Sequence, residues 1–154
     1  MTNTSTLSPI DERLCFALYS TSQAIIKKYK KSLAKLNMTY PQYLAYLVLS
    51  GQDSMIVKDL GQALYLDSAT LTPLLKRMEQ SGLVTRQRAS DDERKVMISL
   101  TPKAKALHDD IATIQKEVAC STGLAPECFN ALLTQLHDLN QQLRTPQADT
   151  TPCS

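Results

Sequence analysis

The chain has 154 residues, of which 43% are hydrophobic and 21% are charged, and its formal net charge is +2. This length suits one domain with a sizeable core, and so small a net charge does not by itself indicate a nucleic-acid partner. No apolar stretch is long enough to cross a membrane, and the first residues lack the basic and apolar regions of a signal peptide. We therefore expect a cytoplasmic protein without a membrane partner.

Cysteine and histidine usage limits the chemistry that the chain can perform. The four cysteines form no C-x-x-C pair, and there are only two histidines. A zinc site or a thioredoxin-like motif is therefore not expected, and we expect neither a metal nor a cofactor. In a reducing compartment unpaired cysteines are most often small buried apolar side chains. The four are Cys15, Cys120, Cys128 and Cys153.

The amino-terminal third of the chain predicts one long helix. Residues 1–9 are polar and are expected to be disordered, and Pro9 is suited to begin a helix. Leucine and isoleucine then recur at helical spacing, which predicts a helix over about residues 10–36. The lysine-rich run at 27–35 is typical of a solvated helix end, with a nucleic-acid contact as the alternative.

Three shorter helices are expected next. Thr39 can cap a helix that has Pro41 near its first turn and ends around Gly51. Residues 55–66 predict a short third helix. Asp67 or Ser68 can cap a fourth helix, which ends at Gly82.

The hydrophobic period changes after Gly82. The β-branched stretches LVTRQR (83–88) and KVMISLT (95–101) flank a polar turn, which predicts a β-hairpin with a charged tip. Thr101 can cap a fifth helix that runs to about Cys120, and Pro126 can start a sixth that runs to about residue 143. Residues 145–154 are expected to be disordered. We therefore expect a single domain over 10–144.

The fourth predicted helix has one apolar face and one polar face. Leu71, Leu74, Leu75 and Met78 follow the spacing of a buried face. The opposite face has small residues, hydroxyls, an amide and two cations, which are groups that can approach base edges and phosphates in a major groove. The candidate DNA-binding residues of this helix are Ser68, Thr70, Pro73, Lys76, Arg77 and Gln80.

Pro73 conflicts with a helix that begins at Ser68, because a proline inside a helix removes a backbone hydrogen bond. A later start, capped by Thr72, is the alternative, and the sequence does not decide between them.

The hairpin offers a second candidate contact. An arginine at the end of a ribbon, Arg94, can reach a narrow minor groove, and Asp92 can brace it through a bidentate pair. Arg86, on the first strand, is a further candidate. A solvated turn explains the charges equally well when they are taken alone. The order helix, turn, helix, hairpin favours DNA binding, because it describes a winged helix-turn-helix.

The stretch from Asp59 to Ala104 resembles the reader and wing of the MarR family of bacterial repressors. Its closing pattern D-x-R-x-x-x-I-x-L-T corresponds to Asp92, Arg94, Ile98, Leu100 and Thr101. The stretch from Leu14 to Leu49 resembles one branch of that family, the organic-hydroperoxide-sensing repressors. The fold implied is mainly α with a small β-hairpin wing. The implied protein is a homodimer. Its DNA-binding region, which we call the reader, lies at about 55–101, and its dimerisation helices lie over 10–36 and 102–144.

The resemblance also implies a function and a site. The implied protein represses transcription from operator DNA, is not an enzyme, and leaves its operator when an organic hydroperoxide oxidises its sensing cysteine. That cysteine falls on Cys15, and the two phenols that tune it fall on Tyr19 and Tyr29 of the partner subunit. Cys120 occupies the place of a resolving cysteine, Cys128 is the competitor, and a small external thiol is the third possibility. Cys153 is expected to be incidental.

Helix geometry, taken without the family resemblance, also supports a thiol site that two subunits share. Tyr29 follows Cys15 by 14 residues, which on a straight helix is about 21 Å along the axis. The two side chains meet only if the second phenol comes from another chain or if the helix breaks. Tyr19 is four residues from Cys15 and is able to contact it within one chain. A position near the start of the helix, in about its second turn, favours the thiolate of Cys15.

Three other functions remain open at this stage. The first is a MarR-type repressor that binds a small aromatic ligand and uses no thiol chemistry. The second is a thiol peroxidase, although the chain lacks the βαβ pattern of that scaffold. The third is a helical adaptor, which leaves the charged hairpin unexplained.

Overall fold

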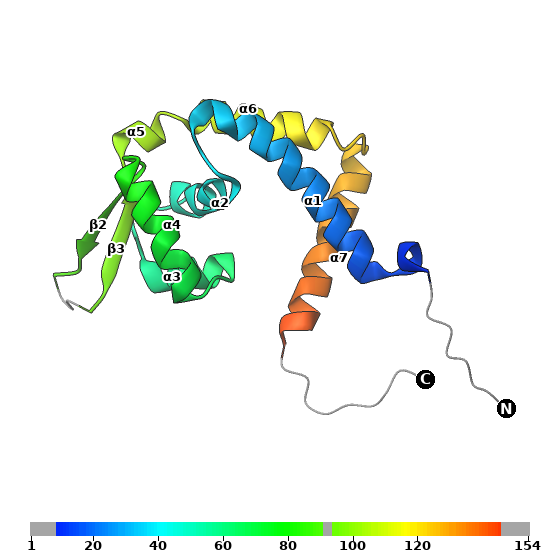
Figure 1. The fold of residues 1–154 in the computed structure, drawn as a ribbon, viewed down its shortest axis with the longest axis horizontal. Coiled ribbons are helices and arrows are strands. Elements are labelled where there is room, and N and C mark those ends of the chain that lie inside the picture. Colours follow the sequence, from blue (N-terminus) through cyan, green and yellow to red (C-terminus); the bar gives the residue numbers. More distant parts are fainter. Residues whose placement is uncertain (1–8, 91–93, 146–154) are drawn as a thin grey trace. The chain divides into compact units, whose positions relative to one another are not determined.

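The computed structural model describes residues 9–90 and 94–145. These residues divide into two compact units, with the boundary between Val118 and Ala119. The first unit contains a long helix, a group of short helices and a small sheet, and the second contains one long helix (Figure 1). The two units are described separately below. Within the described residues, no helix is both long enough and apolar enough to span a membrane.

The predicted helix over 10–36 consists of three segments. A 3-10 turn at Ile10–Glu12 precedes α1 (Leu14–Leu33), and a second 3-10 turn follows at Ala34–Leu36. The single-helix prediction is therefore wrong at its ends. Arg13 has an extended backbone, which separates the first turn from α1. Asn37 ends the last turn in the left-handed conformation that asparagine tolerates.

The helix α2 (Tyr40–Ser50) begins with a capping box, as Thr39 predicts. The Thr39 hydroxyl accepts a hydrogen bond from the Gln42 N–H at 3.4 Å, and the Gln42 side chain accepts one from the Thr39 N–H at 2.9 Å. The two bonds satisfy backbone donors that a helix start otherwise leaves unpaired.

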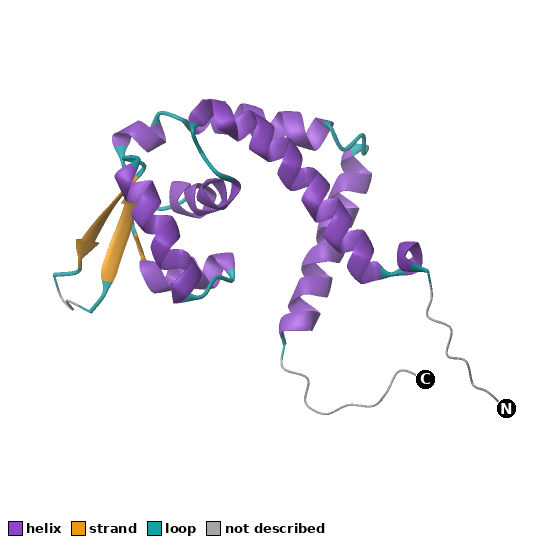
Figure 2. Ribbon diagram, viewed as in Figure 1, coloured by secondary structure: helices purple, strands orange, loops and turns teal. Residues whose placement is uncertain are grey.

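The predicted helix over 55–66 is shorter than expected, because its first two residues form a strand. The chain runs through β1 (Met55–Ile56) directly into α3 (Val57–Leu64). The strand β1 pairs antiparallel with β3 (Val96–Leu100), which in turn pairs with β2 (Val84–Arg88). In the described residues the hairpin thus belongs to a three-stranded sheet of order β1-β3-β2 (Figure 2).

The helix α4 (Ser68–Gln80) has the earlier of the two possible starts. Asp67 caps it, and its side chain accepts a hydrogen bond from the Thr70 N–H at 2.7 Å. Pro73 therefore lies inside the helix, and the start at Thr72 is wrong. Because Pro73 has no N–H, the carbonyl of the residue four positions before it receives no hydrogen bond from Pro73. The chain leaves the helix at Gly82, whose φ of 72° is the left-handed conformation typical of a glycine there.

The predicted helix over 102–120 is interrupted after one turn. The helix α5 (Pro102–Lys105) is capped by Thr101, whose hydroxyl accepts a hydrogen bond from the Ala104 N–H at 3.1 Å. The chain then turns before α6 (His108–Cys120). This break corrects the expectation of one continuous fifth helix.

The core of the first unit joins all these elements. The helix α2 contacts α1, α3, α4 and β3, so it lies at the centre of the unit. The largest fully buried side chains come from five helices and two strands: Leu33, Tyr46, Leu49, Leu60, Leu75, Met78, Val84, Ile98 and Ile111.

The second unit contains α7 (Pro126–Arg144), with Pro126 at its first position as predicted. No residue of this helix is buried in the single chain. Its leucines follow helical spacing, so α7 has an apolar stripe without a cover in the monomer. Residues 1–8, 91–93 and 146–154, and with them Asp92 and Cys153, lie outside the described residues.

Candidate thiol site and nucleic-acid interface

Cys15 lies in the first turn of α1, one residue after its start at Leu14. The expected position in the second turn is therefore wrong by one turn, because the residues before Arg13 form a separate 3-10 segment. The thiol is free and exposed. The interpretation of Cys15 as a small buried side chain is thus wrong, and the thiol is accessible to an oxidant.

The helix α1 is continuous from Leu14 to Leu33, so it does not break between Cys15 and Tyr29. The separation of about 21 Å along the axis therefore holds in the folded chain. Tyr29 of one chain cannot contact Cys15 of the same chain. Tyr19, one turn beyond the thiol, has 64% of its surface exposed.

Tyr29 belongs to a cluster of three aromatic rings, which we call the tyrosine cluster. Its ring centroid lies 5.4 Å from that of Tyr40 and 4.9 Å from that of Tyr43, both of α2. Centroids at these distances are in the range of favourable aromatic pairs. Tyr40 and Tyr43 are absent from the predicted site. The signal that points to them is the stretch TYPQY at the start of α2, where two phenols lie three residues apart.

Burial raises the pKa of the Tyr43 phenol well above its ordinary value, and a hydrogen bond to Tyr29 adds to this rise. A hydrogen bond from the Gln115 side chain of α6 acts in the opposite direction. Burial also raises the pKa of Tyr40, with a smaller contribution from Tyr29. These phenols therefore keep their protons at neutral pH and remain able to donate hydrogen bonds.

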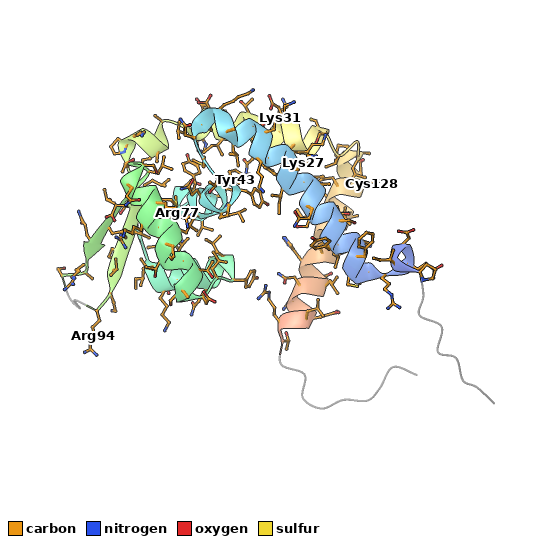
Figure 3. All side chains as sticks on the ribbon, viewed as in Figure 1. Lys27, Lys31, Tyr43, Arg77, Arg94 and Cys128 are labelled. Carbon is orange, nitrogen blue, oxygen red and sulfur yellow. The ribbon has the colours of Figure 1, made fainter. Side chains whose placement is uncertain are left out.

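The other described cysteines lie in the second unit. Cys120 is the last residue of α6, and Cys128 is in the first turn of α7 (Figure 3). Both thiols are free and exposed, so neither matches the expectation of a small buried side chain.

The two faces of α4 follow the predicted pattern. Leu71, Leu75 and Met78 are buried, and Leu74 is partly buried. The candidate DNA-binding side chains of this helix are all exposed, with Ser68 and Thr70 near its start and the others opposite the buried face: Pro73, Lys76, Arg77 and Gln80.

Arg86 of β2 is bound to α4. Its Nε and a terminal nitrogen lie 2.9 Å and 2.6 Å from one carboxylate oxygen of Glu79. The pair is partly exposed, so its contribution to folding is small, about 0.2–1 kcal/mol. The pair also has a geometric effect. It joins the hairpin to α4 and orients the guanidinium of Arg86, which is one of the predicted DNA contacts.

A groove of about 900 Å³ lies between α3, α4 and the hairpin. Its lining combines Ser68 and Thr72 of α4 with Arg86, Arg94 and Lys95 of the hairpin. Arg94 is exposed at the end of the hairpin, where its side chain extends away from the ribbon (Figure 3). Hydroxyls and cations thus meet around one concave surface, a chemistry suited to phosphates.

Comparisons with known proteins agree with this architecture. Residues 26–111 match a family model described as the transcriptional regulator SarA/Rot. The chain is 45% identical over 134 residues to the organic hydroperoxide resistance transcriptional regulator of Bacillus subtilis. The aligned stretch covers 87% of this chain and 91% of that protein.

Two solved structures of AbfR from Staphylococcus epidermidis are also similar. The reduced protein bound to DNA matches at 32% identity with a TM-score of 0.75, over 88% of this chain and 92% of that one. The disulfide form matches at 31% identity with a TM-score of 0.64, over 88% and 90% of the two chains. Sequence identity of 31–45% over nearly the whole of both chains shows membership of one family, which a shared fold alone would not. The chain therefore belongs to the MarR family of transcriptional regulators, in the branch of the organic hydroperoxide resistance regulators.

Proposed function

We propose that this protein is a redox-sensing repressor that binds operator DNA as a homodimer and is released when Cys15 is oxidised. The observation that carries the proposal is the exposed Cys15 thiol at the start of an unbroken helix, whose other end bears Tyr29. The similarity to the hydroperoxide resistance regulator, and to a relative solved both on DNA and in a disulfide form, supports it. The expected location is the cytoplasm.

Exposed apolar side chains support a dimer. Leu14 and Ile25, which are eleven residues apart and so share one face of α1, are exposed in the single chain, as are Tyr19 and several leucines of α7. Large apolar side chains that recur along one helix face are typical of an interface. A partner copy that packs its α1 across this one also brings the partner's Tyr29 to Cys15, which no contact within one chain achieves.

The proposed DNA contacts come from α4 and the wing. The exposed face of α4 enters a major groove, with Ser68 and Thr70 near its start and Arg77 further along. Arg94 reaches the adjacent minor groove. Arg86 remains a candidate DNA contact, and its bond to Glu79 also makes it a brace between the hairpin and α4. Asp92 remains a candidate partner of Arg94.

The proposed chemistry starts at the Cys15 sulfur. The thiolate attacks one oxygen of an organic hydroperoxide, the O–O bond breaks, and the alcohol leaves after it takes up a proton, so that Cys15 becomes a sulfenic acid. A second thiol then attacks the sulfenic sulfur, a disulfide forms, and the oxygen leaves as water. Cys120 is our preferred second thiol, Cys128 is the competitor, and a small external thiol is the third candidate.

The tyrosine cluster offers a route from the thiol to the reader. We propose that Tyr19 and Tyr29 of the partner bind the reduced Cys15, and that oxidation breaks these hydrogen bonds. Tyr29 packs against Tyr40 and Tyr43 of α2, and α2 contacts both α4 and β3. A displacement of Tyr29 therefore moves α2, which supports the DNA-binding region. The two DNA-binding regions of the dimer then lose the spacing that matches two half-sites of the operator.

The experiment that tests this function is fluorescence anisotropy of the protein on a labelled duplex, selected from a random library by the reduced wild type. Cumene hydroperoxide is expected to release the wild type. The Cys15→Ser variant is expected to bind equally well and to stay bound at the same oxidant dose. The Arg94→Ala variant is the matched control, with about tenfold weaker binding and unchanged thiol oxidation.

Continued binding of the wild type after Cys15 is oxidised would contradict the redox mechanism and favour a repressor that responds to a small aromatic ligand. Catalytic turnover of peroxide with a reductant would instead favour a peroxidase. Non-reducing mass spectrometry of the oxidised dimer identifies the second thiol, because Cys120, Cys128 and an external thiol give different linked masses.

A further inference from the structure

Tyr43 lies at the point where α1, α2 and α6 meet (Figure 3). Its phenol forms one hydrogen bond with Tyr29 of α1 and another with the side-chain amide of Gln115 of α6. Only 2% of the Tyr43 surface is exposed, so these two partners, rather than water, satisfy its hydroxyl. The three side chains therefore form a chain of hydrogen bonds, Gln115–Tyr43–Tyr29, which we call the relay.

Packing holds the two phenols of the relay together. The centroids of the Tyr29 and Tyr43 rings lie 4.9 Å apart with an interplanar angle of 30°, and Tyr40 packs against both rings. Gln115 follows Ile114, which is buried in the core, but Gln115 itself is exposed. The outer end of the relay can therefore be substituted without leaving a cavity in the core.

A phenol has one proton, so Tyr43 donates to only one of its two partners. In the first possible arrangement the Gln115 amide N–H donates to the Tyr43 oxygen, and the Tyr43 O–H donates to the Tyr29 oxygen. In the second, Tyr29 donates to Tyr43, and Tyr43 donates to the Gln115 carbonyl oxygen. Burial has the largest effect on the pKa of Tyr43, the bond to Tyr29 raises this pKa further, and the bond to Gln115 lowers it. A donated bond raises the pKa of a phenol and an accepted bond lowers it, so this pattern favours the first arrangement.

The direction of the relay decides what Tyr29 can do. In the first arrangement Tyr29 accepts a hydrogen bond from Tyr43 and keeps its own proton for another acceptor. A hydroxyl that accepts a hydrogen bond also donates a stronger one, because hydrogen bonds in a chain polarise one another. In the second arrangement the proton of Tyr29 is bound to Tyr43, so Tyr29 offers no donor to a thiolate.

We propose that Gln115 is a positioning residue for the thiol site. Its amide directs the proton of Tyr43 to Tyr29, and the proton of Tyr29 is thereby directed to the sulfur of Cys15 of the partner subunit. Gln115 acts through the two phenols and not by contact with the thiol. This inference deepens the proposed function and rests on it, because it takes Tyr29 of one subunit as the donor to the thiolate of the other.

The test changes the hydrogen-bonding character of Gln115 and keeps its length. Gln115→Glu replaces the amide donor by an acceptor, so the Tyr43 proton turns to the carboxylate and the Tyr29 proton turns to Tyr43. Gln115→Lys keeps a donor. The measurement is the rate at which iodoacetamide alkylates Cys15 between about pH 5 and 9, followed by mass spectrometry of the peptide that contains Cys15, because the thiolate is the reacting form.

Gln115→Glu is expected to move the rise of the alkylation rate to higher pH by about 0.5 unit, because the thiolate loses a donated hydrogen bond. Gln115→Lys is expected to match the wild-type profile. Tyr43→Phe should shift the profile in the same direction but less, because Tyr29 keeps its proton and loses only the bond that it accepts. Gln52→Glu, at an exposed position in the turn after α2, is the matched control for added charge and should leave the profile unchanged.

The double variant with Gln115→Glu and Tyr43→Phe separates the relay from a simple effect of charge. If Gln115 acts through the Tyr43 hydroxyl, the double variant matches Tyr43→Phe and is shifted less than Gln115→Glu alone. If the new carboxylate repels the thiolate through space, the two shifts add, and that result would overturn the proposal.

Two further outcomes would overturn the relay. A wild-type profile of Gln115→Glu would exclude the proposed direction of the protons. A later rise in Gln115→Lys would show that the shape of Gln115 matters and its donor does not. Failure of the proposed function looks different, because Tyr29→Phe then leaves the Cys15 profile unchanged, or the oxidised wild type stays on its duplex. A shift in Tyr29→Phe without one in Gln115→Glu rejects the relay and leaves the proposed function standing.

Discussion

At the scale of single residues, Asp67 combines a structural role with a position beside the candidate DNA face. Its carboxylate accepts hydrogen bonds from the Thr70 N–H and from the Thr70 side chain, and these bonds hold the pKa of Asp67 below its ordinary value. The bonds form only in the folded state. A carboxyl whose pKa is lower in the folded state stabilises the protein above its unfolded pKa and loses this effect as the pH falls through the folded pKa.

Asp67→Ala is expected to lower the midpoint of urea unfolding at pH 6, because the first turn of α4 loses its cap. The difference from the wild type should shrink as the pH falls below about 4, since the pKa of Asp67 in the folded state lies below its ordinary value of 3.8 and the carboxyl is protonated as the pH passes through it. Asp67→Asn is the control, because its amide oxygen can cap the helix without titrating. A difference between Asp67→Ala and the wild type that stays constant over this range would contradict the titration of Asp67.

At the scale of elements, the close approach of α3 and α4 depends on Gly61. A Cβ atom built on this glycine would lie 3.1 Å from the Leu66 carbonyl oxygen and 3.2 Å from a methyl carbon of Leu71. The carbonyl belongs to the backbone of the turn, which the Leu66 hydrogen bond to Gly61 holds in place. The turn between the two helices therefore leaves little room for a side chain.

Gly61→Leu should lower the free energy of unfolding by about 2 kcal/mol, because the side chain overpacks the contact between the helices. Urea unfolding followed by circular dichroism measures this change. Ala63→Leu, at an exposed position on the same helix, is the control and should stay within about 0.5 kcal/mol of the wild type. If Gly61→Leu matches this control, the two helices are less tightly packed than the structure shows.

At the scale of the whole molecule, the apolar stripe of α7 requires a partner surface. Leu132, Leu136, Leu139 and Leu143 are spaced by four, three and four residues, so they share one face of the helix. Leu143 has 75% of its surface exposed in the single chain. Because none of the residues of α7 is buried in the monomer, the dimer that we propose is the simplest cover for this stripe.

Leu136→Glu should shift the protein from dimer to monomer in sedimentation equilibrium, because a carboxylate placed in an apolar interface is desolvated without a partner. Operator affinity should fall by about tenfold or more, since each reader then binds its half-site independently. Gln141→Glu, which makes a similar change on the opposite face of α7, is the control and should remain a dimer. A dimeric Leu136→Glu variant would place the dimer contact elsewhere.

Local signals in the sequence determine most of the elements. The caps at Thr39 and Thr101 form as predicted, and Asp67 is one of the two caps predicted for α4, because each bonds a backbone N–H within three residues and needs no distant partner. The hairpin follows from two β-branched stretches around one polar turn. The buried face of α4 follows from its spacing of apolar residues. These features depend on neighbours along the chain, so they can be predicted from the sequence.

Contacts between distant residues determine the rest. Met55 and Ile56 become a strand only because β3, some 40 residues later, offers antiparallel partners at Ile98 and Met97. The tyrosine cluster joins α1 to α2, and the Arg86–Glu79 pair joins the hairpin to α4. The sequence alone proposed Cys15, Tyr19 and Tyr29 as candidates for the thiol site, but only the tertiary structure showed the neighbours of Tyr29 and the bond between Arg86 and Glu79. The physical reason is that periodicity records which face of an element is apolar, whereas the partner of a side chain depends on how the elements pack.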